Sequence, residues 1–150
     1  MSWNRLKIGR SSTCNGEYFI TFTTDKRERY FLEYDLAVTF CRQIAINENA
    51  FNCNWLTWVL MPDHFHGLLR LNTKEHDLAK VVGALKGSSS RIINKQLNRT
   101  GRLWQPNFFD RALRVEEDRK AVARYIVLNP IRKELVVSLK QYPFWDSIYL

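Results

Sequence analysis

Two histidines, His64 and His66, stand two positions apart and are the residues best suited to chemistry. The residues around them predict a β-strand, and side chains at i and i+2 of a strand lie on the same face. Two imidazoles on one face can bind one divalent cation, and imidazole suits zinc, manganese or iron better than magnesium. The alternative is two hydrogen-bonded polar residues at the corner of a hairpin. The third histidine, His76, is interpreted as a surface residue.

Tyr125 and Asn129 form a second candidate pair, four residues apart in a segment that predicts a helix. Residues at that spacing share one helix face, so a phenol hydroxyl would stand beside an amide oxygen. A tyrosine hydroxyl can serve as the nucleophile in covalent catalysis when a nearby cation or base activates it. The alternatives are a core aromatic for Tyr125 and helix termination for Asn129, because Asn-Pro is a stop signal.

A basic segment lies between these two pairs: residues 86–114 contain seven Lys or Arg and one Asp. Arg91, Lys95 and Arg99 recur every four residues, opposite the apolar stripe of a predicted helix. Aromatic residues mixed with such charges are typical of proteins that stack single-stranded bases. The aromatic residues of this segment are Trp104, Phe108 and Phe109. Core packing is the alternative interpretation, and we expect it to hold for at least one of them.

The charge of the whole chain points in the same direction. The net charge is +8, of which residues 1–85 carry +1 (ten Lys or Arg less nine Asp or Glu) and residues 86–150 carry +7 (thirteen less six). This asymmetry favours a polyanionic partner, nucleic acid above all. The alternative is a solvated basic face that only keeps the protein in solution.

Length and composition indicate one globular domain over residues 1–150, with 45% hydrophobic and 25% charged residues. No apolar run reaches the ~18 residues of a membrane span, and the N-terminus does not predict a secretory signal. Three cysteines without CxxC spacing argue against a disulfide framework or a cysteine zinc site. These features predict a cytoplasmic protein.

Hydrophobic patterning predicts an α+β domain with a ferredoxin-like split βαβ fold, in which helices pack on an antiparallel four-stranded sheet and a C-terminal extension follows. The predicted strands are 17–24, 55–61, 65–71 and 112–115, and the predicted helices are 34–49, 74–98 and 116–129. Gly83 and Gly87 in the second helix predict a kink or a close backbone approach. Pro130 is expected to end the last helix.

Three runs in this order resemble the motifs of one family, the HUH-type, IS200-like single-strand tyrosine transposases. The run 61–69 (MPDHFHGLL) looks like their His-hydrophobic-His motif. The run 103–111 (LWQPNFFDR) is similar to the Leu-Trp-Gln…Phe…Asp-Arg signature of the REP-associated branch. The run 125–132 (YIVLNPIR) looks like that branch's Tyr-Ile-x-x-Asn-Pro-x-Arg motif, which holds the nucleophile. The resemblance covers roughly residues 15–135, the implied catalytic core.

The resemblance implies a metal-dependent transposase that nicks single-stranded DNA beside a hairpin and transfers strands. His64, His66 and Asn129 would hold Mg²⁺ or Mn²⁺ against the scissile phosphate. Tyr125 would attack that phosphate and form a covalent 5′-phosphotyrosine. The DNA backbone would be positioned by Lys86, Arg91, Lys95, Arg102, Arg111 and Arg114.

This chain departs from the family pattern at Asp63, where Asn is usual, at Phe109, where His is frequent, and at Gly67, where a bulkier apolar residue is usual. None of these changes removes a candidate metal ligand or the nucleophile. The alternative function is a non-catalytic nucleic-acid-binding domain of the same fold. The sequence leaves the recognised DNA sequence open, as well as the choice between monomer and homodimer.

Overall fold

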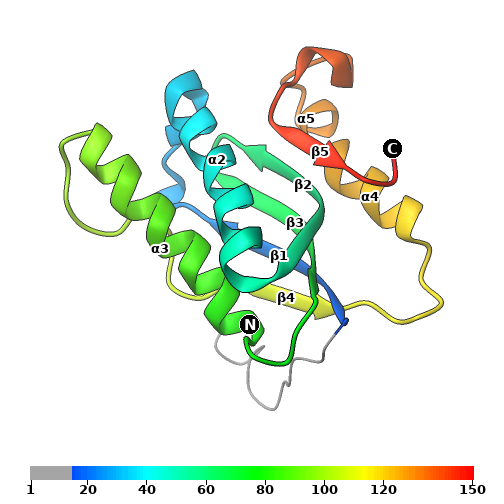
Figure 1. Cartoon of the computed structure of the whole chain (residues 1–150). Coiled ribbons are helices and arrows are strands. Elements are labelled where there is room, and N and C mark those ends of the chain that lie inside the picture. Colours follow the sequence, from blue (N-terminus) through cyan, green and yellow to red (C-terminus); the bar gives the residue numbers. More distant parts are fainter. Residues whose placement is uncertain (1–14) are drawn as a thin grey trace.

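The computed structural model describes residues 15–150, which form a five-stranded antiparallel sheet in the order β4-β1-β3-β2-β5 (Figure 1). The strands are β1 (Glu17–Thr23), β2 (Cys53–Met61), β3 (His64–Leu71), β4 (Phe109–Ala112) and β5 (Trp145–Ser147). The helices are α2 (Tyr34–Phe51), α3 (Leu78–Gln96), α4 (Arg119–Val127) and α5 (Asn129–Arg132), with short 3-10 turns η1 (Asp25–Arg27), η2 (Tyr30–Leu32) and η3 (Leu139–Gln141). The sequence-based interpretation of Cys14 lies outside the described residues.

The order of the first four strands confirms the predicted split βαβ arrangement. The sheet has one strand more than predicted, because the C-terminal segment adds β5 to the free edge of β2. The fourth strand begins three residues earlier than the predicted range 112–115. It ends early because the amide of Arg114 donates to the side chain of Glu117 at 2.7 Å, which closes a turn.

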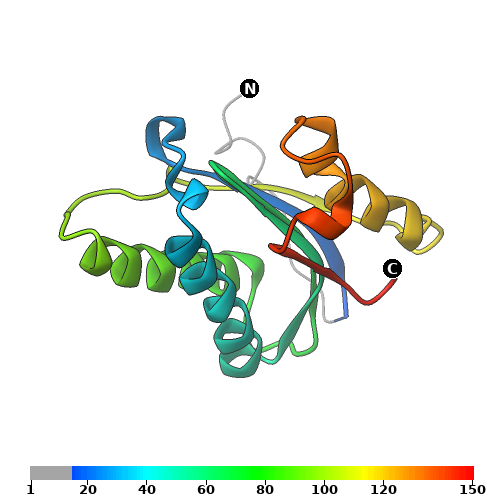
Figure 2. The same cartoon turned by 90° about the horizontal axis from the view of Figure 1, so that it is seen from above.

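Helices cover both faces of the sheet (Figures 1 and 2). Helices α2 and α3 pack on one face, and α4 with α5 lies on the other. Phe65 and Leu69 of β3 belong to the larger core beneath α2 and α3, whereas Leu68 belongs to the smaller core beneath α4. Successive side chains of a strand point to opposite faces. His64 and His66 therefore face α4 and α5.

The side chain of Trp55 packs so closely against position 67 that it leaves no room for a Cβ atom there. A Cβ at Gly67 would lie 2.7 Å from the Trp55 ring, closer than atoms can approach without displacement. The Trp55 indole N–H donates to Asn47 at 2.9 Å, and the Asn47 amide donates to the Val81 carbonyl at 3.0 Å. This buried network ties β2, α2 and α3 together. The large indole occupies the space that a larger residue 67 would fill.

Two expectations about the helices are wrong. Helix α3 runs without interruption through Gly83 and Gly87, and a Cβ at either position would meet nothing within 4 Å, so there is no close backbone approach. Pro130 does not end the helical region: α4 ends at Val127, and Pro130 lies in the first turn of α5. Proline is tolerated there because the first amides of a helix have no intrahelical partner.

Candidate active site

The two imidazoles of β3 lie together on the sheet face below α4 and α5, with ring centroids 4.6 Å apart. His64 is buried and His66 is half-buried. His66 stands opposite Thr21 of β1 in the strand register, and His64 stands opposite Thr23. The predicted placement of both histidines on one face is confirmed.

Each imidazole is oriented through its Nδ1 atom. Nδ1 of His64 lies 2.7 Å from Oδ1 of Asp63, and Nδ1 of His66 lies 2.7 Å from the Thr21 hydroxyl. The other carboxylate oxygen of Asp63 accepts from Nε of Arg27 at 3.0 Å. Histidines that bind metals through Nε2 are oriented by such hydrogen bonds at Nδ1.

Both imidazoles favour the neutral form that a metal ligand requires. Burial lowers the pKa of His64, although the hydrogen bond and charge of Asp63 oppose this. Burial, followed by the positive charges of His64, Arg132 and Lys133, lowers the pKa of His66 to about 3. For Asp63, burial opposes ionisation, but His64 and Arg27 outweigh burial and keep the carboxyl pKa below its usual value.

The candidate nucleophile and the candidate amide ligand come from the helical segment above the histidines. Tyr125 near the end of α4 is 58% exposed, whereas Asn129 at the start of α5 is buried. Both side chains line one pocket of about 430 Å³ together with the two histidines. The remaining lining residues are Thr21, Thr23, Arg27, Arg132 and Lys133. The structure thus brings together all four residues that the sequence singled out.

Three cations border this pocket that sequence reasoning did not assign to the site. The guanidinium carbon of Arg132 lies 4.4 Å from the centre of the Tyr125 ring, and Arg132 also donates to the Tyr125 carbonyl. Arg132 is part of the Tyr-Ile-x-x-Asn-Pro-x-Arg run, so the sequence motif could have assigned it to the site. Arg27 and Lys133 belong to none of the three motifs, so the sequence did not indicate their place in the site. Arg27 reaches the site from η1, where it and Lys26 adopt left-handed backbone conformations.

The pocket offers few donor atoms for a divalent cation. Within residues 15–150, no group of three or more His, Cys, Asp and Glu side chains could hold a metal. A cation here would therefore take two imidazoles and the Asn129 amide. The side-chain amide nitrogen of Asn129 donates a hydrogen bond to the Ile126 carbonyl at 3.4 Å, which leaves the side-chain amide oxygen to bind the cation. The two imidazoles favour a transition metal over Mg²⁺, whereas the amide oxygen suits Mg²⁺ and Mn²⁺ alike.

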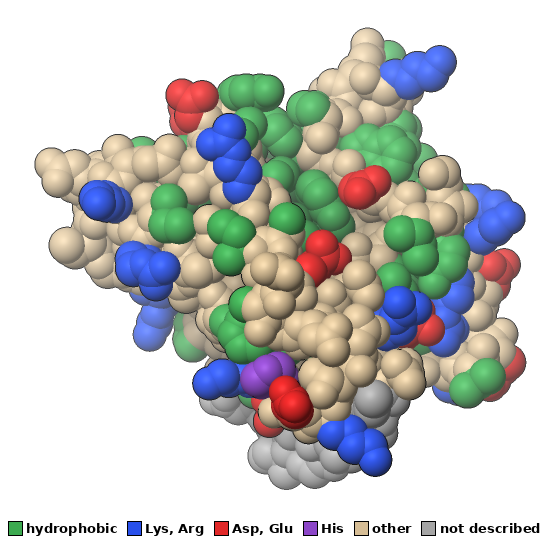
Figure 3. Space-filling view, in the orientation of Figure 1, with side chains coloured by type: hydrophobic (Ala, Val, Ile, Leu, Met, Phe, Trp, Pro, Cys, Tyr) green, Lys and Arg blue, Asp and Glu red, His purple; other side chains and the backbone are tan. Residues whose placement is uncertain are grey.

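The six basic residues expected to contact DNA are dispersed. Lys86 donates to the carbonyls of Gln105 and Asn107, so it anchors the loop before β4. Arg91 and Lys95 are exposed on α3, the helix on the opposite face of the sheet from Tyr125. Figure 3 shows separate basic side chains on this side of the molecule rather than one continuous patch.

The other three of these residues are exposed nearer to β4. Arg111 lies in β4 itself and forms an ion pair with Glu117 at 2.8 Å, and Arg102 and Arg114 are exposed before and after that strand. Among the aromatic residues of this segment, Trp104 and Phe108 are buried in the core, as expected for at least one. Phe109 is half-buried.

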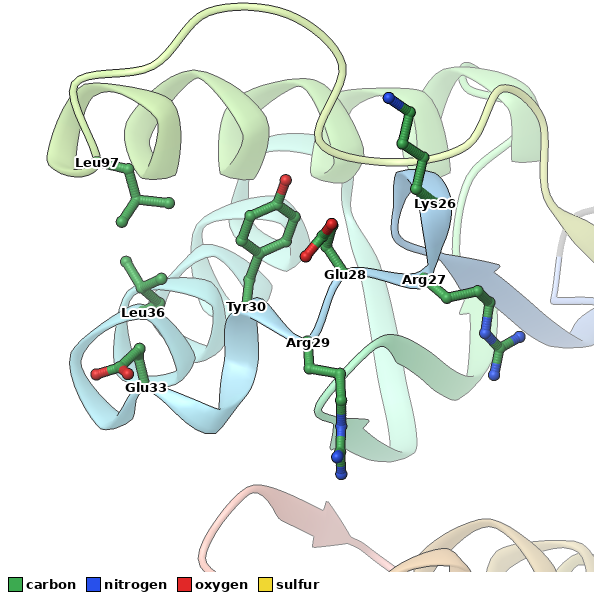
Figure 4. Close-up of a pocket in the computed structure, with 8 residues that line it drawn as sticks. All are labelled: Lys26, Arg27, Glu28, Arg29, Tyr30, Glu33, Leu36 and Leu97. Carbon is green, nitrogen blue, oxygen red and sulfur yellow. The ribbon is translucent and has the colours of Figure 1, made fainter.

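A larger hollow of about 590 Å³ shares Arg27 with the histidine pocket (Figure 4). It lies beside η1 and η2, and Tyr30 and Leu97 are among the residues that border it. Lys26 and Arg29 point away from each other there (Figure 4). Its described lining contains no histidine. The candidate chemistry therefore belongs to the smaller pocket.

Comparison with known proteins decides the family. Residues 12–129 match the model of a family described as Transposase IS200 like. The chain belongs to the IS200-like transposase family. This transposase is 24% identical over 144 residues to a protein assigned as a REP-associated tyrosine transposase in Haemophilus influenzae, a match that covers 90% of this chain and 81% of the relative.

A second relative supports the same branch. The transposase is 29% identical over 90 residues to the REP-associated tyrosine transposase of Escherichia coli K12, which covers 58% of this chain and 50% of that relative. The matched part thus amounts to half of the Escherichia coli protein. Both relatives confirm the resemblance to the REP-associated tyrosine transposases.

Two solved structures share the fold of this transposase. The structure of a REP-associated tyrosine transposase bound to a REP hairpin superposes with a TM-score of 0.80 at 21% identity, covering 97% of this chain and 82% of that one. A protein assigned as a transposase from Deinococcus radiodurans superposes with a TM-score of 0.56 at 27% identity, covering 80% and 95%. These likenesses confirm the α+β fold.

No helix within residues 15–150 is long and apolar enough to span a membrane.

Proposed function

We propose that this transposase nicks single-stranded DNA and transfers strands through a covalent bond to Tyr125, with the help of a divalent metal. One observation carries the proposal: the hydroxyl-bearing side chain of Tyr125 lines the same pocket as His64, His66 and Asn129. A nucleophile must lie beside the groups that stabilise the charge of its target. We assign the catalytic core to residues 15–135 of a single domain.

In the proposed step, the phenol oxygen of Tyr125 attacks the scissile phosphorus. A Tyr125–phosphorus bond forms, the bond from phosphorus to the 3′ oxygen of the preceding nucleotide breaks, and the products are a 5′-phosphotyrosine and a free 3′-hydroxyl. Tyr125 loses its proton and the leaving oxygen gains one, so the step is balanced. Because the phosphodiester is exchanged rather than hydrolysed, a later 3′-hydroxyl can reverse the step and join a new strand.

His64, His66 and Asn129 would hold the metal, Mg²⁺ or Mn²⁺. A cation in this position supplies Lewis-acid stabilisation of charge on the phosphate oxygens. The protein contributes the orientation of the two imidazoles through Asp63 and Thr21.

The cations around the pocket support a phosphate as the group that is bound. Arg27, Arg132 and Lys133 line the pocket with the histidines. Guanidinium groups bind phosphate oxygens through paired N–H donors. Outside the pocket, the six residues Lys86, Arg91, Lys95, Arg102, Arg111 and Arg114 are proposed to contact the DNA backbone. Such contacts depend on salt.

The substrate is proposed to contain a hairpin next to the single strand that is cut. Support comes from the solved relative, which is described as bound to a REP hairpin. A transposase with this substrate acts where the chromosome is, on nucleoid DNA in the cytoplasm.

The test uses labelled single-stranded DNA with random sequence beside a hairpin, Mn²⁺, and denaturing gels. We expect a protein–DNA adduct that disappears in Tyr125→Phe and with a chelator. Tyr34→Phe is a matched control, because Tyr34 is similarly exposed, at 66% against 58% for Tyr125, but lies on α2, outside the pocket. Salt-sensitive binding without any adduct would instead support the second candidate, a non-catalytic DNA-binding domain.

A further inference from the structure

Tyr125 separates two hollows of similar size. Besides the polar pocket with the histidines, it borders a second pocket of about 420 Å³ on the same face of the sheet. The lining residues of this second pocket are Phe19, Phe109, Arg111, Ala121, Val122 and Tyr125. They come from β1, from the edge strand β4 and from α4, and all but Arg111 are aromatic or apolar.

The walls of this pocket are aromatic rings in tilted and edge-to-face arrangements. The Phe19 and Phe109 rings are 6.4 Å apart at 77°, and the Phe19 and Tyr125 rings are 6.2 Å apart at 54°. Phe19 also lies 5.7 Å from the ring of His66, so it connects the two hollows. Rings in such arrangements offer faces and edges to a further planar group.

Phe109 differs from the other aromatic residues of its segment. Trp104 and Phe108 are core residues, whereas Phe109 is half-buried and belongs to neither core cluster of the described chain. At the rim of the pocket, Arg111 keeps 48% of its side chain exposed while one of its N–H groups bonds to Glu117. A guanidinium has five N–H donors, so donors remain for a polar ligand edge.

We propose that this second pocket binds one unpaired nucleobase of the substrate strand, the base next to the phosphate that Tyr125 attacks. This inference rests on the proposed function. A strand whose phosphate lies at Tyr125 must continue past it, and the aromatic pocket begins at the same side chain. Base faces stack on aromatic rings irrespective of sequence, and Arg111 can reach the polar edge or the adjoining phosphate. The mixture of aromatic walls and one cation suits a nucleotide better than an apolar peptide.

The experiment replaces each nucleotide near the cleavage site, one at a time, by an abasic residue. With the wild-type protein, we expect one position adjacent to the cleaved phosphate at which base removal slows adduct formation by about 5- to 150-fold. Phe109→Ala should slow the reaction of the intact substrate by a similar factor and should add no further loss on the abasic substrate. Phe109→Leu keeps apolar volume without a ring and should behave like Phe109→Ala, whereas Phe109→Trp should retain most activity.

The control is Tyr34→Ala, which removes an exposed aromatic ring outside both pockets. The inference is overturned if adducts form normally with every abasic substrate, or if the losses from Phe109→Ala and base removal simply multiply. Failure of the proposed function looks different, because the wild-type protein would then form no adduct at all.

A binding measurement tests whether the pocket holds a base even if the wild-type protein forms no adduct. In Tyr125→Phe protein, 2-aminopurine fluorescence should be quenched at one position of the strand, and Phe109→Ala should abolish the quench. Equal quenching with and without the Phe109 ring would overturn the inference.

Discussion

The carboxylate of Asp63 lies 2.7 Å from Nδ1 of its sequence neighbour His64. Because the Asp63 pKa is lowered, the carboxylate is ionised at neutral pH and can only accept, so Nδ1 of His64 must carry the proton. The lone pair of the imidazole is then on Nε2. Arg27 fixes the second carboxylate oxygen at 3.0 Å. The hydrogen bonds that connect Arg27, Asp63 and His64 thus select the tautomer that a metal site requires.

Asp63→Ala is expected to weaken metal binding about 10- to 100-fold, the range found when an orienting partner of a metal ligand is removed. The reason is that His64 loses the acceptor that holds both its tautomer and its ring. Titration of Mn²⁺ by electron paramagnetic resonance measures the affinity directly.

Two variants control this prediction. Asp63→Asn keeps an oxygen acceptor and should lose less affinity than Asp63→Ala. Glu75→Ala removes one negative charge from an exposed position outside the pocket and should leave the affinity unchanged. Equal affinity of Asp63→Ala and wild type would show that His64 needs no orienting carboxylate.

The metal-free protein should lose folding stability as the pH falls from 7.5 to 5. The pKa of His66 is about 3 in the folded state, against an ordinary value of 6.5 for an imidazole in an unfolded chain. Below pH 6.5 the unfolded chain therefore binds more protons, and the free energy of unfolding falls with falling pH until about pH 3. Between pH 7.5 and 5 the loss from this one group is about 2 kcal/mol. Urea unfolding with a chelator present measures it.

His66→Gln supplies the comparison for the pH effect. This variant has no imidazole at position 66, so its free energy of unfolding should change less between pH 7.5 and 5 than that of the wild type, whatever its absolute stability. A wild-type and a variant profile of the same slope would contradict the assignment of a depressed pKa to His66.

Gly67→Ala should destabilise the fold by about 1–3 kcal/mol, the usual cost of overpacking a core. The added Cβ would meet the Trp55 ring at 2.7 Å, and Trp55 is held in place by Asn47. Gly83→Ala is the matched control, because a Cβ there meets nothing within 4 Å inside α3. It should stabilise the protein by about 0.5–1 kcal/mol. Thermal unfolding of both variants distinguishes a local clash from a general effect of glycine replacement.

Replacing both Arg91 and Lys95 with Ala should weaken DNA binding and flatten its dependence on salt. Each lost contact to a single-stranded phosphate reduces the slope of log affinity against log salt by about 0.7. The pair should therefore reduce it by about 1.4. Affinities measured from 50 to 300 mM salt test this, and unchanged binding at low salt would remove α3 from the DNA surface.

Local sequence patterns determined which residues make up the candidate site. Strand alternation put His64 and His66 on one face, and helical spacing put Tyr125 beside Asn129, because both relations depend only on the repeat of one element. The family motifs supplied the link between the two pairs. Element boundaries were less predictable: β4 ended earlier and α5 followed α4, since a turn closed by Glu117 and a proline in a first turn depend on local hydrogen bonds.

The tertiary structure alone decided which charged side chains surround the candidate site. Arg27 comes from a turn 37 residues before His64, and no periodic pattern connects them. Conversely, Arg91 and Lys95 form a regular stripe, yet α3 packs on the sheet face that is turned away from Tyr125. The aromatic pocket also arises only where β1, β4 and α4 meet. A linear pattern records which residues share one element's face, but the face of the sheet that each element covers is set by how the whole core packs.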